Sequence, residues 1–66
     1  MANYAFIDNN NLVVNCLVFD ENDFEIIEQT KKNYNAIDAV KYDVNTFVSP
    51  NVSIWDGKNF ITNEIV

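Results

Sequence analysis

The stretch Ser53-Ile54-Trp55-Asp56-Gly57-Lys58-Asn59-Phe60-Ile61 decides how the C-terminal part of the chain folds, and it holds the single tryptophan and the single glycine. An Asp-Gly pair between apolar and aromatic flanks is a strong hairpin signal, because such pairs supply the positive φ angles of a tight primed turn. Aromatic side chains also suit a pleated, half-buried surface. The sequence therefore predicts a β-hairpin with strands at 52–55 and about 58–62.

A second hairpin is predicted at the N-terminus, where two β-rich runs at 3–7 and 12–19 flank an Asx cluster at 8–11. By parity, one side of the second strand carries Leu12, Val14, Cys16 and Val18, and the other carries Val13, Asn15, Leu17 and Phe19. Because both sides are apolar, we expect both to be covered, one by a helix and the second by a partner chain.

An amphipathic helix is expected from about Asp23 to Asn33 or Asn35. Asn22 followed by Glu25 resembles a capping box, and Glu28 and Lys32 have the favourable i, i+4 polarity. Spacings of three and four predict a stripe that faces a sheet, made of Phe24, Ile27, Lys31 and Tyr34, with Ile26 and Thr30 beside it.

Apolar and charged residues alternate over the segment 39–44, which predicts a strand. Val40, Tyr42 and Val44 are expected on its covered side, and Lys41 and Asp43 on its solvent-exposed side. Pro50 lies in the connection at 45–51, where it cannot donate to a strand ladder. Together these elements predict one small α+β domain over residues 1–66: N-terminal hairpin, helix, strand and C-terminal hairpin. We expect the helix to lie on an antiparallel sheet of four or five strands.

Charge excludes several classes of function. Four lysines and no arginine stand against ten acidic residues, a net charge of −6, which disfavours binding to nucleic-acid phosphates or to an anionic membrane. No apolar run approaches the roughly 20 residues that span a bilayer, and the start lacks the pattern of a signal peptide. We therefore expect the protein to be made and kept inside a cell, or packed into something that is assembled there.

The chain has few residues of the types that act in catalysis or bind metals. With no histidine and one cysteine, the chain lacks the common zinc ligand sets and an internal disulfide. The acidic cluster at 20–25 is interpreted as helix capping, since a calcium loop needs a glycine there. Cys16 has no nearby cation to stabilise a thiolate and is interpreted as a small hydrophobe. We predict no catalytic, cofactor-binding or metal-binding residue.

Aromatic residues suggest two further roles. Tyr4, Phe6, Tyr42, Trp55 and Phe60 are able to form a stacking platform for single-stranded nucleic acid or sugar, although core packing is the favoured interpretation. A domain this short buries only about 60% of its unfolded surface, so assembly is expected to supplement its core. The residues predicted for an interface are Trp55, Phe60, Leu17, Phe19 and Tyr4.

Two segments resemble short structural proteins of tailed bacteriophages. Residues 2–18, from Ala2-Asn3-Tyr4-Ala5-Phe6-Ile7-Asp8 to Val18, are similar to the "MANxAxIDxxxxVxNVIV" start of small tail or virion proteins, in which the position of Cys16 is more often Val. Residues 52–61 resemble the "vgWxydGxxF" hairpin of tail-fibre and tail-fibre-assembly proteins, without the Pro-rich continuation usual there. The resemblance covers about half the chain and implies a structural role in a phage.

The expected function is that of a non-enzymatic virion component, of tail or capsid surface, that self-assembles or docks on a larger structural protein. An alternative is an acidic phage-encoded inhibitor, or nucleic-acid mimic, that occupies a basic site on a host protein. That alternative predicts carboxylates gathered on one face. An enzyme is the third interpretation, because catalysis would have to run on carboxylates, lysine and tyrosine alone.

Overall fold

The computed structural model describes residues 1–20 and 22–62. The elements are β1 (Ala2–Ile7), β2 (Val13–Phe19), α1 (Phe24–Asn33), β3 (Asp38–Tyr42), β4 (Ser53–Trp55) and β5 (Phe60–Thr62). The α+β class and the predicted order of elements are confirmed. The strands do not form one sheet, however: β2, β1 and β3 form an antiparallel sheet in that order, while β4 and β5 form a separate pair. An isolated bridge between Leu12 and Ile54 links the two.

Both predicted hairpins are present, each closed by an aspartate. In the first, the Asp8 carboxylate accepts the backbone N–H groups of Asn10 and Leu12, and Asn11 adopts a φ of 65°. In the second, the Asp56 carboxylate accepts those of Lys58 and Asn59. Of the Asp-Gly pair only Gly57 has a positive φ, at 101°. The predicted tight primed turn is therefore replaced by a four-residue loop between Trp55 and Phe60, which pair directly.

Helix α1 ends as predicted but begins differently. Asn35 adopts a φ of 54°, and the Ala36 and Asn35 N–H groups donate to the Lys31 and Lys32 carbonyls, which is a Schellman ending. The capping-box prediction is wrong: the N-cap is Asp23, it makes no side-chain cap bond, and the Asn22 N–H donates to Asp20 instead.

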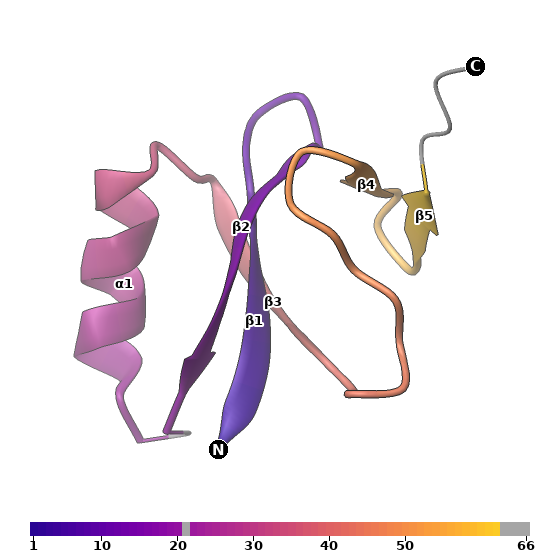
Figure 1. Cartoon of the computed structure of the whole chain (residues 1–66). Coiled ribbons are helices and arrows are strands. Elements are labelled where there is room, and N and C mark those ends of the chain that lie inside the picture. The colour runs from indigo at the N-terminus through magenta and orange to yellow at the C-terminus, as the bar shows by residue number, and fades with distance from the viewer. Residues whose placement is uncertain (21, 63–66) are drawn as a thin grey trace.

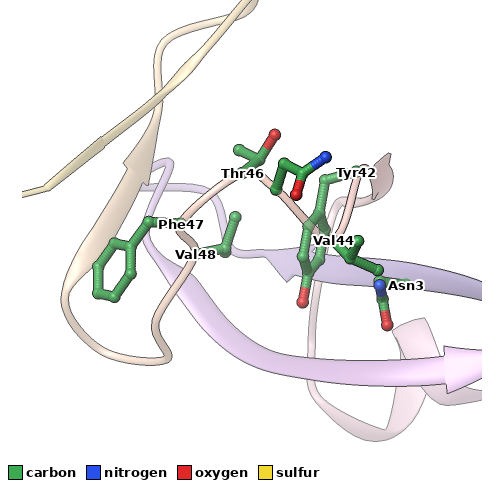
Figure 2. Close-up of a pocket in the computed structure, with 7 residues that line it drawn as sticks. Asn3, Tyr42, Val44, Thr46, Phe47 and Val48 are labelled. Atoms are coloured by element: carbon green, nitrogen blue, oxygen red, sulfur yellow. The ribbon is translucent and has the colours of Figure 1, made fainter.

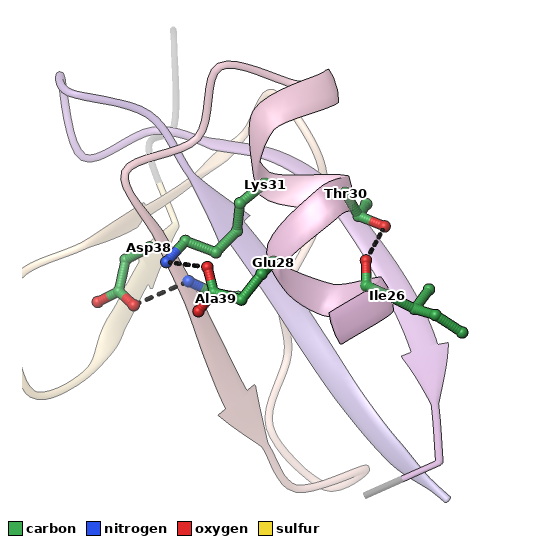
Figure 3. Close-up of polar contacts among 6 residues, drawn as sticks. All are labelled: Ile26, Glu28, Thr30, Lys31, Asp38 and Ala39. Carbon is green, nitrogen blue, oxygen red and sulfur yellow. Dashed lines mark hydrogen bonds and ion pairs between the residues drawn. The ribbon is translucent and has the colours of Figure 1, made fainter. Parts of the chain in front are cut away.

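The predicted apolar stripe of α1 is only partly correct. Ile27 is buried, whereas Phe24 is 69% and Ile26 52% exposed. In a helix of ten residues, about one side chain per turn can contact the sheet. Phe24 lies in the first turn and is outside the contact between α1 and the sheet. The Lys31 ammonium pairs with Glu28 at 3.3 Å, which replaces the predicted Glu28–Lys32 pair (Figure 3).

The three-stranded sheet is covered on both sides (Figure 1). Helix α1 lies on the side that we call the helix face, which carries Tyr4 and Phe6 of β1 with Leu17 and Phe19 of β2. The opposite side, the hairpin face, carries Asn3, Ala5 and Ile7 with Cys16, Val18, Val40 and Tyr42. There Val48, Trp55 and Phe60 pack against the buried cluster of Ala5, Ile7 and Val13.

The chain's own C-terminal hairpin covers part of the second side of β2, for which a partner chain was predicted. Val18 on that side is 55% exposed, and the partner itself stays a prediction. A register shift between Phe6 and Ile7 also moves Val13, which pairs with Ile7 and is fully buried beside it. The bulge therefore breaks the simple parity that placed Val13 with Phe19.

Candidate interaction surface

A groove runs along the hairpin face where β3 leaves the sheet. It has a volume of about 460 Å³ and is lined by Asn3, Tyr42, Val44, Asn45, Thr46, Phe47 and Val48. β1 supplies Asn3, β3 supplies Tyr42, and the connection after β3 supplies the rest. Figure 2 shows Val44 and Asn3 beside the Tyr42 ring, with Phe47 pointing away from that ring beyond Val48. We call these seven residues the 44–48 groove.

The connection that lines the groove is held at both ends by hydrogen bonds from its backbone N–H groups. After β3, the Thr46 N–H donates to the Asp43 carbonyl, and the Asp43 carboxylate accepts the Asn45 N–H. Before β4, the Ser49 N–H donates to the buried hydroxyl oxygen of Ser53 at 2.9 Å. Val48 is anchored against the core. Residues 44–47 therefore form a short loop held out from the sheet.

Two apolar side chains of this loop face solvent. Val44 is 79% and Phe47 66% exposed, and on β2 the nearby Val18, directly opposite Asn3, is 55% exposed. Val44 was predicted on the covered side of a strand, but β3 ends at Tyr42, so the alternation stops two residues earlier. Exposed apolar groups beside a groove are typical of protein interaction sites.

Charge is absent from the groove. None of its seven lining residues is ionisable at neutral pH, on a chain with a net charge of −6. A smaller cleft of about 230 Å³ lies next to it and shares Tyr42 and Thr46. That cleft does hold charges, because Lys41, Asp43 and Lys58 line it together with Trp55 and Phe60. Uncharged lining removes the main obstacle to contact between two copies of an acidic protein.

The five predicted interface residues do not share one surface. Trp55 and Phe60 are half-buried on the hairpin side, with ring centroids 4.6 Å apart. Leu17, Phe19 and Tyr4 lie on the helix face, where the Tyr4 and Phe19 rings are 6.2 Å apart. The same division separates Tyr4 and Phe6 from Tyr42, Trp55 and Phe60, so these aromatics do not form a single stacking platform.

The sequence carried a signal for the groove that pattern reasoning missed. Phe47 and Val48 are an apolar pair inside a connection otherwise made of Asn, Thr, Ser and Pro. One of the two, Val48, is anchored in the core, while its neighbour Phe47 is exposed. An isolated large apolar residue in a polar loop marks a candidate contact.

Cys16 and Tyr42 are the described groups near the groove with perturbed titration. Burial raises the pKa of the Cys16 thiol, while a side-chain hydrogen bond with Tyr42 lowers it. Burial and the bond to Cys16 together raise the pKa of Tyr42 to about 12. Within the described residues no three Cys, Asp or Glu side chains converge on a possible metal position. This environment keeps the thiol protonated, as a packing residue rather than a nucleophile.

No protein-family model, curated protein or solved structure matches the chain. In the described part of the chain, no helix is both long and apolar enough to cross a membrane.

Proposed function

We propose that the chain is a non-enzymatic structural protein of a bacteriophage particle and that it assembles with copies of itself through the 44–48 groove. The observation that carries the proposal is the exposure of Val44 and Phe47, at 79% and 66%, beside a groove without charged residues. A domain of 66 residues has a small core, so burial of further apolar surface in an assembly adds a large share to its stability.

The groove and the exposed ring lie on the same part of the molecule, which suits a two-fold contact. In such a contact Phe47 of one copy enters the groove beside Tyr42 of the second copy, and the reverse contact forms at the same time. An aromatic side chain that fills a pocket is the typical anchor of an interface. Because the contact is apolar, salt does not weaken it, and screening of the negative charges favours it.

The phage setting is supported by the resemblance of residues 2–18 and 52–61 to small tail and virion proteins. In the structure these segments build the two hairpins. The motif residues therefore serve folding, and the groove supplies the contact. Detection of the chain by mass spectrometry in purified phage particles supports this part of the proposal, and its absence from such particles contradicts it.

The alternative of an acidic inhibitor is less well supported, because the aspartates are used locally. Five of the six aspartates accept backbone N–H groups in turns or at strand ends: Asp8, Asp20, Asp38, Asp43 and Asp56. They also lie at different places. Asp8 and Asp38 flank one end of the sheet, Asp20 and Asp43 follow the strands at the other end, and Asp56 lies in the last hairpin. A nucleic-acid mimic needs its carboxylates along one face.

The groove contact is tested by paired substitutions. We expect Phe47→Asp to weaken self-association by about 2 kcal/mol or more, roughly a 30-fold change in dissociation constant, because it places a charge in an apolar contact. Phe24→Asp is the matched control, since Phe24 is 69% exposed at the first turn of α1, where an acidic residue is well tolerated. Sedimentation equilibrium measures both. Equal association of the two variants and the parent chain contradicts the proposed contact.

A further inference from the structure

In the part of the chain that the structure describes, β2 and β3 are the outer strands of the three-stranded sheet and form its edges. Two backbone bonds show which groups point outward. The Asp8 N–H donates to the Leu12 carbonyl at 3.0 Å, and the Ile7 carbonyl accepts the Ile37 N–H at 2.7 Å. Because backbone groups alternate in direction along a strand, even-numbered residues of β1 point to β2 and odd-numbered residues to β3.

The register then identifies the outward-facing backbone groups. On β2 beyond the bulge, Asn15 and Leu17 lie opposite even-numbered residues of β1, so the backbone groups of Cys16 and Val18 point away from the sheet. On β3, Val40 lies opposite Ala5, so the backbone of Ala39 points away. Outward groups on an edge strand are a template on which a strand of another chain can pair.

The beginning of β2 is already covered by the chain itself. The Asn51 N–H donates to the Val13 carbonyl at 2.7 Å, and the Trp55 N–H donates to the Asn11 carbonyl at 2.8 Å. The part of this edge beyond that cover and the bulge is residues 15–19, where Cys16 and Val18 carry the outward backbone groups.

At both edges an Asx side chain occupies the outward N–H group next to it. The Cys16 N–H donates to Asn15 Oδ1 at 2.8 Å, and the Ala39 N–H donates to Asp38 Oδ1 at 2.8 Å (Figure 3). In each case the acceptor is the residue just before the donor. A donor occupied in this way is not available to an incoming strand.

Asn15 is itself held in place from the helix side. Its Nδ2 donates to the Tyr34 hydroxyl at 2.9 Å, and the Tyr34 ring lies 6.0 Å from the buried Phe6 ring. With Nδ2 fixed by Tyr34, the amide oxygen is directed at the Cys16 N–H. Tyr34, the C-cap residue of α1, thereby orients the side chain that occupies the Cys16 N–H at the β2 edge.

We infer that Asn15 and Asp38 close the open edges of the sheet against strand pairing with a second copy of the chain, and that Tyr34 is a positioning residue for Asn15. Strand pairing at Cys16 and at Ala39 is thereby disfavoured. This inference rests on the hydrogen bonds at the edges and stands whether or not the 44–48 groove is an interface.

The test removes the acceptor oxygens while it keeps side-chain shape. Asn15→Leu and Asp38→Leu are expected to strengthen self-association by about tenfold, whereas Asn15→Asp and Asp38→Asn keep the acceptor and remain at the parent level. Asn9→Leu adds the same apolar surface at an exposed turn and is the control for non-specific association. All variants are made in the Phe47→Asp background, so that a groove contact does not mask the result.

Two measurements decide the outcome. Sedimentation equilibrium gives the association constants, and amide hydrogen exchange at low concentration reports on the edge of the monomer. We expect faster exchange of the Cys16 amide in Asn15→Leu and, to a smaller degree, in Tyr34→Phe, with the Ala39 amide unchanged. The inference is overturned if Asn15→Leu and Asp38→Leu associate no more than Asn9→Leu, or if the Cys16 amide exchanges at the parent rate in Asn15→Leu.

Discussion

The Tyr42 hydroxyl and the Cys16 thiol form a side-chain hydrogen bond across the central strand of the sheet. Tyr42 belongs to β3 and Cys16 to β2, and between these strands β1 presents Ala5, which is fully buried and pairs directly with Cys16. The register places Cys16, Ala5 and Tyr42 on the same, hairpin face of the sheet. Burial raises the pKa of both groups; the bond adds to the rise at Tyr42 and offsets part of the rise at Cys16.

This contact predicts a loss of stability at alkaline pH. Burial and the bond to Cys16 raise the pKa of Tyr42 from 10.0 to about 12, so the unfolded chain loses this proton at lower pH than the folded chain. The contribution of Tyr42 to the free energy of unfolding is therefore complete below pH 10 and is lost as pH rises towards about 12. The raised pKa of Cys16 adds a loss of the same sign, beginning above its ordinary value of 9.0.

Tyr42→Phe isolates the effect, because it removes the ionising hydroxyl and keeps the ring that packs on Phe60. We expect the variant to be less stable than the parent chain at neutral pH and to lose less stability between neutral and alkaline pH. Urea unfolding across that range measures both slopes. Parallel pH profiles for parent and variant would show that Tyr42 titrates normally in the folded chain.

Substitution of Gly57 tests the loop of the last hairpin. Gly57 has a φ of 101°, and a Cβ added there meets no atom within 4 Å, so the cost of Gly57→Ala comes from backbone conformation alone. We expect a loss of about 1–2 kcal/mol in the free energy of unfolding. Lys58→Ala, in the same exposed loop, is expected to change it by less than about 0.5 kcal/mol. Equal effects of the two substitutions in thermal or urea unfolding would contradict the need for glycine.

Two phenylalanines with opposite environments test the packing of the helix face. Phe6 is fully buried and its ring lies 6.0 Å from both the Phe19 and Tyr34 rings. We expect Phe6→Ala to cost about 3–5 kcal/mol, which is a large part of the stability of a domain this small. Phe24 is 69% exposed, so Phe24→Ala is expected to cost about 0.5 kcal/mol or less.

If Phe6→Ala does not fold, Phe6→Leu is the milder substitution that still allows Phe6 to be compared with Phe24. Its expected cost is about 1–1.5 kcal/mol, still above that of Phe24→Ala. Urea unfolding gives all three values. If Phe24→Ala lowers the free energy of unfolding more than Phe6→Leu does, Phe24 packs against the sheet as the helical spacing predicted, and its exposed position is contradicted.

Local signals in the sequence were sufficient for the order of elements. The Asx cluster at 8–11 and Asp56-Gly57 mark the two hairpins, and Asn35 marks the helix end, because each of these residue types favours a turn through its own backbone or side-chain chemistry. The Asp-Gly pair located the last hairpin correctly. It did not fix the turn type, since the Asp56 carboxylate draws the loop into a longer, side-chain-capped form.

Features that depend on contacts between distant segments were beyond the sequence pattern. The bulge at Ile7 moves Val13 to the hairpin face, and no residue type in this segment predicts a bulge. The cover of part of that face by Trp55 and Phe60 brings together segments that are distant in the sequence. The exposure of Phe24 follows from how little of α1 touches the sheet. For the groove, the apolar Phe47 in a polar loop was visible in the sequence, but its approach to Tyr42 and Asn3 was not.

Light scattering at low and high salt gives the mass of the purified protein in solution, and this mass shows whether the chain self-assembles. The proposal predicts a stable oligomer at both salt concentrations, which Phe47→Asp converts to a monomer and Phe24→Asp does not. A monomer at both salt concentrations would contradict self-assembly through the 44–48 groove and would leave docking on a larger structural protein, or the acidic inhibitor, as the function to pursue.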